Sequence, residues 1–432
     1  MNTTQIILLA TCGLLFIIQI LYLFLLYNVK RIASPQPTEV GGERLEVRAQ
    51  AGAANNPNPS PLTPNQIPNS SFLIPNSTNL PPLSVVISTS NQDFLLKKNL
   101  PLILEQDYPD FEVIVVDDNS TDETADILQQ LQARYPHLRT TFVPPTSRRI
   151  SHHKLALTLG IKATTNDWLV FTEADCHPAT SGWLRSLAAQ LSPLTTNPSA
   201  VVGYTGYDRS RGLSAALRGY DTLLRGLRLL GLASHGKAHM AYGTNLLYRR
   251  DIFFGDAKGY SRHLNLERGD DDIFVNENIR PAHIRAAVSP DAVVRCADTS
   301  RRHWRLERLS RIATRRYLRG IRPLTLGFDT LSRVLYILAT IAAIVLSLPA
   351  VHRSLLGDQS PVWWLVIGIA ALLWLIRYVL SWIVWNRSSR ALGERSFGPA
   401  LPLLEALHPL WELALRIQYL LSSKQRYRRK LL

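Results

Sequence analysis

Strands and helices alternate along the middle of the sequence, and this order constrains the fold more than any other feature. Apolar runs rich in Val and Ile at 83–88, 111–116 and 168–172 predict buried strands. Apolar positions at helical spacing predict helices at 94–106, 122–135 and 155–163, and a further strand is expected near 140–143. Such an alternation predicts right-handed crossovers and a mostly parallel sheet, and therefore an α/β fold.

Polar side chains follow the ends of these strands. Ser88, Asp118 and Asp175 each come at or just after a strand end, and ligands of parallel sheets bind at the carboxyl ends of the strands. The sequence contains no GxGxxG after its first strand and no GxxxxGK[ST], so phosphates must be bound by a metal and by basic side chains. Lys154 closes a basic run, 147–154, that comes just before a helix whose N-terminus favours anions.

Two carboxylates follow the strand 168–172 with one residue between them. Strand alternation sends Glu173 and Asp175 to the same side of the chain, where both can bind one cation. Two oxygen ligands with several open positions suit Mg²⁺ or Mn²⁺. The alternative is an acidic loop after a core strand, because acid-x-acid tripeptides are common.

A second acidic cluster follows Gly269. Asp270, Asp271 and Asp272 precede an amphipathic helix. Adjacent carboxylates repel, so one of them is expected to have a raised pKa unless cations compensate, which suits a group that accepts a proton from an attacking hydroxyl. An acidic cap on the helix N-terminus explains the same residues, and both interpretations can hold together.

Arginines are dense around Trp304, and the whole chain has a net charge of +15. This cluster can reach donor phosphates, anionic lipid headgroups or both. Nucleic acid is not an expected partner, because apolar membrane runs flank the region. The arginines are Arg301, Arg302, Arg305, Arg308, Arg311, Arg315, Arg316, Arg319 and Arg322.

Apolar runs near both ends predict membrane helices. The run 6–27 is long enough to cross a bilayer and is followed at once by Lys30 and Arg31, which favours a retained anchor over a cleaved signal peptide. Runs at 335–351 and 362–385 predict two more spans.

The positions of basic residues predict the orientation of these spans. Arginines follow the second C-terminal span and basic residues end the chain, so the positive-inside rule places the α/β part and the C-terminus in the cytoplasm, in a multi-pass protein of the inner membrane. The segment 397–421 is expected to be an amphipathic helix lying at the interface with membrane lipids.

Composition then divides the chain into four parts. Residues 33–82 are rich in Pro, Asn, Ser and Gly, which is typical of a flexible linker. The expected organisation is an N-terminal anchor at 1–32, this linker, an α/β domain at 83–322 and a C-terminal membrane region at 323–432.

The cysteines bear on the compartment of the folded part. Cys12, Cys176 and Cys296 are scattered and odd in number. They predict neither a disulfide framework nor a CxxC metal site, and hence a reducing compartment.

The motifs together resemble family 2 glycosyltransferases of the GT-A fold, of the membrane-attached bacterial kind, over residues from about 84 to 322. The matching motifs are LSVVIS at 83–88, EQDYP at 105–109, VVDDNSTDET at 115–124, TEADC at 172–176 and GDDD at 269–272. The resemblance implies that Asp118 contacts the nucleotide base and that Asp175 binds the metal on the diphosphate. Glu173 stands where the family has Asp and remains a competent ligand.

The resemblance also assigns the remaining site residues. The general base comes from the acidic cluster, with Asp271 preferred over Asp270. The stretches 203–207 and 240–249 build the acceptor side, which implies acceptor contacts for Tyr242 and Asn245. From the sequence alone, packing explains Tyr204, Tyr207 and Tyr242 equally well.

Relatives have a Gln-x-x-Arg-His or Gln-x-x-Arg-Trp segment after a tryptophan that corresponds to Trp304. This chain departs from the segment, with Glu307 at the Gln position and Ser310 at the Arg position. Trp304 and Glu307 are nevertheless expected on the acceptor side, and Arg308 on the donor side with Ser88 and Lys154.

The implied function is that of an inverting, metal-dependent glycosyltransferase. It would move a sugar from a nucleotide-diphosphate donor to a lipid-linked or cell-surface glycan acceptor at the cytoplasmic membrane face. Because only two clear spans follow the catalytic part, addition of one or few sugars is expected. The alternatives are a processive polysaccharide synthase and an inactive, membrane-anchored nucleotide-sugar-binding or scaffold protein.

Overall fold

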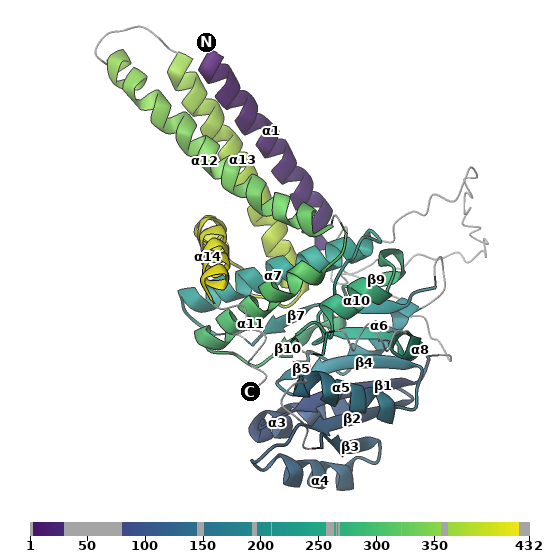
Figure 1. Ribbon diagram of the computed structural model, residues 1–432. Helices are drawn as coiled ribbons and strands as arrows, with labels where there is room; N and C mark the ends of the chain where they lie inside the picture. The colour runs from purple at the N-terminus through teal and green to yellow at the C-terminus, as the bar shows by residue number, and fades with distance from the viewer. Residues whose placement is uncertain are drawn as a thin grey trace, which may run out of the picture.

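A computed structural model describes most of the α/β domain and the apolar helices. The described residues are 3–29, 80–144, 151–191, 197–208, 210–255, 263–264, 266, 268–320, 322–355 and 362–422. Nearly all of the expected linker, the basic residues Lys30 and Arg31, the run 147–150 and the basic C-terminal tail lie outside them. In Figure 1, three long helices extend away from a body that contains the sheet.

The body is built on a seven-stranded sheet with the order β3-β2-β1-β4-β8-β6-β9. Strand β8 is antiparallel to its neighbours β4 and β6, and the other pairs are parallel. The expected mostly parallel sheet is therefore confirmed. The strands are β1 (Leu83–Thr89), β2 (Phe111–Asp117), β3 (Leu138–Phe142), β4 (Trp168–Glu173), β6 (Ala200–Gly203), β8 (Leu246–Arg249) and β9 (Ile284–Ala287).

A second, three-stranded sheet has the order β5-β10-β7. Its strands are β5 (Cys176–Pro178), β7 (Thr205–Tyr207) and β10 (Val294–Cys296). Strand β10 is antiparallel to β5 and parallel to β7. Because β5 follows β4 after two residues, this small sheet fixes the path of the chain just beyond the carboxylates Glu173 and Asp175.

Helices cover both faces of the large sheet, because its central strands are apolar on both sides. Val85 and Ile87 of β1 pack with α3, α4 and α6, whereas Val86 faces the side packed by α5, α7 and α10. The helices of the body are α3 (Asp93–Leu104), α4 (Thr124–Arg134), α5 (His152–Ala163), α6 (Trp183–Ala188), α7 (Leu213–Ser234), α8 (Arg250–Gly255), α10 (Asp272–Asn278) and α11 (Arg301–Thr314). Short 3₁₀ turns are η1 (Ala189–Leu191), η2 (Pro281–His283), η3 (Pro290–Ala292), η4 (Arg315–Tyr317) and η5 (Gly398–Ala400).

Within the described residues, three helices are long and apolar enough to cross a membrane, which confirms the expected apolar helices near both ends. They are α1 (Thr3–Leu26), α12 (Arg322–Leu355) and α13 (Val362–Ala391), with candidate spans Ile6–Leu26, Gly327–Ser347 and Trp364–Ala391. A fourth helix, α14 (Leu401–Leu421), exposes Leu410 and Leu413 and buries Glu405 and Glu412, so its exposed side is apolar. Its place at a membrane interface stays a prediction.

The second span begins eight residues before the expected residue 335. Asp329 and Arg333 interrupt the apolar pattern there, but both are buried and their side chains lie 3.1 Å apart, four residues along one helix. Arg228 of α7 also pairs with Asp329, and the Tyr27 hydroxyl donates to the same carboxylate. This buried group of charges joins α1 and α12 to the body that contains the sheet.

Candidate active site

One cavity collects the expected metal carboxylates. It encloses about 720 Å³, including its open mouth, and lies beyond the carboxyl end of β4, between β7, α7 and α11. Tyr207 and Tyr242 contribute aromatic walls. Its charged lining side chains are Glu173, Asp175, Arg225, Arg268, Glu307 and Arg311. Acidic and basic groups thus share the cavity, as binding of a metal-diphosphate requires.

The two carboxylates Glu173 and Asp175 fit a divalent cation. Both line the cavity, and Asp175 is only partly buried. Burial of the Asp175 carboxyl, together with the nearby negative charge of Glu173, raises its pKa to about 7. A divalent cation bound at the two carboxylates would offset this repulsion. Carboxylate oxygens are also the ligands that Mg²⁺ and Mn²⁺ prefer. Arg268 approaches Glu173 at 3.2 Å and provides part of the compensating charge.

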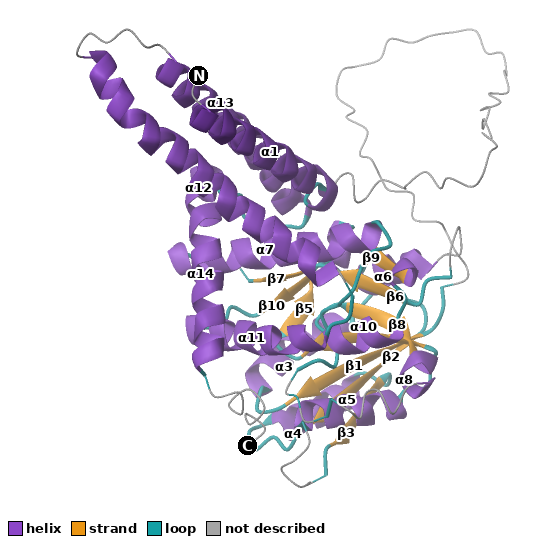
Figure 2. Ribbon diagram, turned by 45° about the horizontal axis from the view of Figure 1, so that its top comes forward, coloured by secondary structure: helices purple, strands orange, loops and turns teal. Residues whose placement is uncertain are grey.

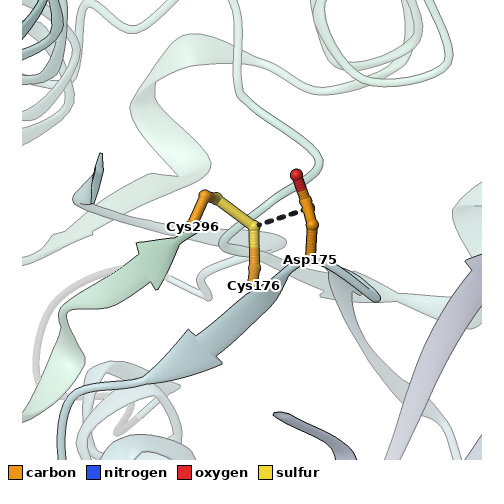
Figure 3. Close-up of side chains that lie close together, drawn as sticks. All are labelled: Asp175, Cys176 and Cys296. Atoms are coloured by element: carbon orange, nitrogen blue, oxygen red, sulfur yellow. Dashed lines mark hydrogen bonds between the residues drawn. A yellow bond between two sulfur atoms is a disulfide. The ribbon is translucent and has the colours of Figure 1, made fainter. Parts of the chain in front are cut away.

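A disulfide adjoins Asp175, and the expectation of unpaired cysteines is wrong. Cys176 and Cys296 stand directly opposite each other on β5 and β10, and their sulfur atoms are bonded (Figure 3). The Cys176 sulfur lies 3.3 Å from Oδ1 of Asp175. A disulfide offers no thiolate to a metal, so neither sulfur is available as a thiolate ligand beside Asp175.

Three arginines face the same cavity. Arg225 comes from α7, Arg268 lies just before the acidic cluster, and Arg311 comes from α11. Arg311 belongs to the arginine cluster around Trp304, whereas Arg225 and Arg268 were not among the expected site residues. The only signal for Arg225 was its position four residues after Asp221 on one helix, where the two side chains pair at 3.2 Å.

Glu307 lies inside this basic wall. Its carboxylate accepts a hydrogen bond from the Tyr207 hydroxyl at 2.8 Å and one from Nε of Arg311 at 3.2 Å. Burial alone would raise its pKa, but the charges of Arg311 and Arg225 lower the pKa of Glu307 to about 2. The residue that replaces the family's Gln is therefore a fixed anion in the cavity lining.

The three carboxylates of the acidic cluster contact different partners. Nε2 of His153 lies 3.4 Å from Oδ2 of Asp270, and Nδ1 of the same ring lies 3.0 Å from the Ser88 hydroxyl. Although burial opposes it, the charge and hydrogen bond of His153 lower the pKa of Asp270. Asp270 is therefore an anion linked through His153 to the end of β1.

Asp271 and Asp272 have different surroundings. Asp271 caps α10 and accepts hydrogen bonds from the Gly243 amide at 2.9 Å and from Arg311 at 3.3 Å. Asp272 is buried and accepts a hydrogen bond from the Thr314 hydroxyl at 2.6 Å. Burial and the charge of Asp271 raise the pKa of Asp272 to about 7, so the raised pKa belongs to the member that was not expected to react.

A second, smaller pocket joins this cluster to the metal carboxylates. Its lining includes His153, Glu173, Asp270 and Asp271. Glu173 lines both this pocket and the main cavity. The acidic cluster therefore adjoins the expected metal site, although the two are 95 or more residues apart in the sequence.

Asp118, the residue expected to contact the nucleotide base, lies at the same edge of the sheet. Asp118 follows β2, and its Oδ1 lies 3.0 Å from Nδ1 of His152 at the start of α5. Ser88 is in register with Glu173 on the neighbouring strand. The ends of β1, β2 and β4 thus bring together the residues expected on the donor side.

Four expected site residues have structural surroundings instead. Lys154 is fully buried and donates to the His263 carbonyl at 2.7 Å. The Asn245 side chain is buried and accepts from the Trp183 indole at 3.1 Å. Trp304 is buried and stacks on Trp411, with ring centroids 4.0 Å apart.

Arg308, the fourth, pairs with buried Asp221 at 3.1 Å. None of these four side chains lines the cavity described above. The structure therefore places these four side chains in the packed interior or in other pockets. Their burial was not predictable, because residue type alone does not say whether a side chain is buried.

Comparison with known proteins agrees with this geometry. Residues 84–254 match the family described as glycosyl transferase family 2. They form a family 2 glycosyltransferase domain. This glycosyltransferase domain contains β1 to β8, and with them Ser88, Asp118, Glu173 and Asp175. The acidic cluster and α11 lie beyond the matched residues.

Several known glycosyltransferases are similar to parts of the chain. A GalNAc(5)-diNAcBac-PP-undecaprenol beta-1,3-glucosyltransferase of Campylobacter jejuni is 47% identical over 53 residues, which cover 12% of this chain and 17% of that protein. Glycosyltransferase AglE of Haloferax volcanii is 28% identical over 189 residues, or 43% of this chain and 58% of AglE. The chain thus spans less than two thirds of the length of either relative.

Solved structures overlap the chain as well. A mannosyltransferase from Pyrobaculum calidifontis, solved with GDP-Man and Mn²⁺, aligns with a TM-score of 0.47 and 19% sequence identity. The alignment covers 94% of this chain and 99% of that one.

Proposed function

We propose that the protein is an inverting, metal-dependent glycosyltransferase that moves a sugar from a nucleotide-diphosphate donor to a lipid-linked or cell-surface glycan acceptor at a membrane. The observation that carries this proposal is the shared cavity of Glu173 and Asp175 with Arg225, Arg268 and Arg311. A nucleoside diphosphate bound to a metal has both the charge and the oxygen atoms that this lining recognises. The Campylobacter jejuni relative carries PP-undecaprenol, a lipid-linked diphosphate, in its name.

Each residue then has a role in the transfer. Asp118 contacts the nucleotide base. Glu173 and Asp175 would hold the metal, which when bound would stabilise the charge of the leaving diphosphate. Arg268 and Arg311 add fixed positive charge beside that diphosphate. Asp271 accepts the proton of the acceptor hydroxyl as it attacks the anomeric carbon, and a single displacement inverts that centre.

The positive-inside rule supports an orientation with the catalytic domain and the C-terminus in the cytoplasm. The disulfide between Cys176 and Cys296 is the observation that opposes it, because disulfides are rare in reducing compartments. The departure of the Glu307 segment from the pattern of processive relatives supports addition of one or few sugars.

Binding and turnover measured together test the proposal. We expect UDP or GDP to bind the full-length protein by calorimetry only with Mn²⁺ or Mg²⁺, and one nucleotide sugar of a panel to be hydrolysed or transferred. Mass spectrometry sizes the product, and NMR gives its anomeric configuration. Absence of nucleotide binding with either metal, or retention at the anomeric carbon, would contradict the proposal.

A further inference from the structure

A pocket rich in arginine lies on the far side of the cavity wall, and residues of α7, α11, α12 and α14 line it. Figure 2 shows α14 beside α7 and α11. We call it the arginine pocket; it encloses about 700 Å³, including its mouth. Asp272 and Glu412 are the acidic residues in its lining. Its six arginines are Arg225, Arg228, Arg308, Arg311, Arg315 and Arg416. Cations thus outnumber anions on the pocket surface by six to two.

Carboxylates hold these arginines in place and leave donors available. Arg225 and Arg308 both approach Asp221 through Nε, at 3.2 and 3.1 Å. Arg315 and Arg416 share Glu412, at 3.4 and 3.1 Å, and about half of each arginine side chain is exposed. Because each guanidinium group has five N–H donors, a single carboxylate contact fixes its position without using its capacity to bind phosphate.

The pocket lies where the chain enters the membrane. Gly327 and Thr330 line it, and the candidate span Gly327–Ser347 begins at the first of them. Leu413 and Ile417 of α14 are exposed, beside Glu412 and Arg416 on the same helix. An exposed apolar face next to arginines is typical of a helix at the level of lipid headgroups.

The arginine pocket also shares a wall with the catalytic cavity. Arg225, Tyr242 and Arg311 line both. The Arg311 guanidinium lies 4.5 Å from the centroid of the Tyr242 ring, and Nη1 of Arg311 lies 3.3 Å from Oδ2 of Asp271. A single layer of side chains therefore separates a group attached to a phosphate in the pocket from Asp271, the carboxylate proposed as the general base.

We propose that the arginine pocket binds the phosphate or diphosphate group of the membrane lipid that carries the acceptor. This inference rests on the proposed function and extends it by assigning the lipid's anionic group to named residues. Arg315 and Arg416 are the half-exposed arginines of the pocket, and Arg311, which the pocket shares with the main cavity, pairs with Asp271. Phosphate oxygens match the forked donors of several arginines better than a sugar hydroxyl does.

Binding of lipids of stated chemistry tests the assignment. Full-length protein in a neutral detergent is titrated with polyprenyl diphosphate, polyprenyl phosphate, phosphatidylglycerol and inorganic pyrophosphate, and binding is measured by native mass spectrometry. The test variant is Arg315→Gln with Arg416→Gln. The matched control is Arg302→Gln with Arg305→Gln, because both residues are exposed on α11 and neither lines a pocket described here.

The expected result is specific. A polyprenyl phosphate or diphosphate should bind at least tenfold more tightly than phosphatidylglycerol or pyrophosphate. Its affinity should fall about tenfold or more in the test variant, since hydrogen bonds to charged groups are worth that factor, and change less than about twofold in the control. Metal-dependent nucleotide binding should be unchanged in both variants, which shows that they fold.

Other outcomes separate the two proposals. Equal lipid affinity in the test variant, or pyrophosphate binding as tight as the polyprenyl lipid, overturns the assignment. So does equal binding of phosphatidylglycerol, which would make the pocket a general anionic-lipid site. If lipid binding depends on Arg315 and Arg416 but no donor sugar is ever transferred, the pocket stands and the proposed function fails.

Discussion

Arg311 links Asp271 to Tyr242: its Nη1 lies 3.3 Å from Oδ2 of Asp271, and its guanidinium group lies over the Tyr242 ring. Arg311 and Tyr242 both line the main cavity, so this contact holds the carboxylate proposed as the base beside the cavity wall. A carboxylate fixed in this way accepts a proton only from a hydroxyl that lies within hydrogen-bond reach.

The first prediction concerns this base. Asp271→Asn should lower kcat by about 10²–10⁴-fold, because general base catalysis contributes that range, and should leave donor affinity within about twofold. Asp270→Asn is the paired variant, since Asp270 contacts His153 rather than Arg311. Single-turnover transfer and nucleotide calorimetry measure the two effects. Full turnover in both variants would place the base elsewhere.

The second prediction concerns the metal and pH. Asp175→Asn should weaken Mn²⁺-dependent nucleotide binding by at least about 100-fold, and Glu173→Gln should do so less, because Arg268 already offsets Glu173. The raised pKa means that the Asp175 carboxyl is protonated below about pH 7 in the metal-free protein. Metal binds the deprotonated form, so apparent Mn²⁺ affinity should rise from pH 5.5 to 7 and then level off. Activity of Asp175→Asn in EDTA would contradict the assignment.

The third prediction concerns the disulfide. Cys176 and Cys296 are 120 residues apart, and loss of a native disulfide typically costs about 2–5 kcal/mol. Cys176→Ser with Cys296→Ser should therefore lower the thermal midpoint, whereas Cys12→Ser removes the free cysteine and serves as the control. Alkylation before and after reduction, read by mass spectrometry, should show one thiol and then three. Three thiols without reduction would show that the bond does not form in the cell.

The fourth prediction concerns the contact between α1 and α7. A Cβ atom at Gly231 would come within 2.6 Å of the Leu26 carbonyl oxygen, whereas one at Gly219 on the same helix would meet nothing within 4 Å. Gly231→Ala should destabilise the protein by about 1–3 kcal/mol through overpacking. Gly219→Ala should stabilise it by about 0.5–1 kcal/mol, because glycine is unfavourable inside a helix. Thermal unfolding of the full chain measures both, and equal midpoints would contradict the packing.

The fifth prediction is the orientation. Cys296 is buried and bonded, so it cannot report on topology, whereas Gln130 is exposed on α4. In a Cys12→Ser background, Gln130→Cys should react with an impermeant maleimide only after the cells are permeabilised. Reaction in intact cells would place the domain on the outer side, where disulfides persist.

Regular elements were predictable where their pattern repeated. The strands β1, β2 and β4 each carry six or seven residues, enough for an apolar run to be recognised. Strands β5, β7 and β10 have three residues each and show no period. The early start of α12 was missed because Asp329 and Arg333 look unsuited to a span until their pairing is seen.

The candidate site was predictable where its residues stand in a recognisable motif at a strand end or just before a helix. Glu173 and Asp175 line one cavity as the strand alternation indicated. Arg225 and Arg268 were missed because α7 and the segment before α10 reach the cavity only in the folded chain. Trp304 was expected at the acceptor side, but its stacking on Trp411 depends on a helix about a hundred residues later in the chain.

The packing of α1 changes what its removal would do. Tyr27 donates a hydrogen bond to Asp329, and Leu23 and Leu26 belong to the same apolar cluster as Leu223 and Leu227 of α7. A shortened protein that starts after residue 80 would therefore expose apolar surface on a catalytic-domain helix and leave buried Asp329 and Arg228 without one of their shared partners. Helix α1 is therefore part of the packed structure of the protein and more than a membrane anchor. A water-soluble fragment without this helix should carry substitutions that replace its contacts.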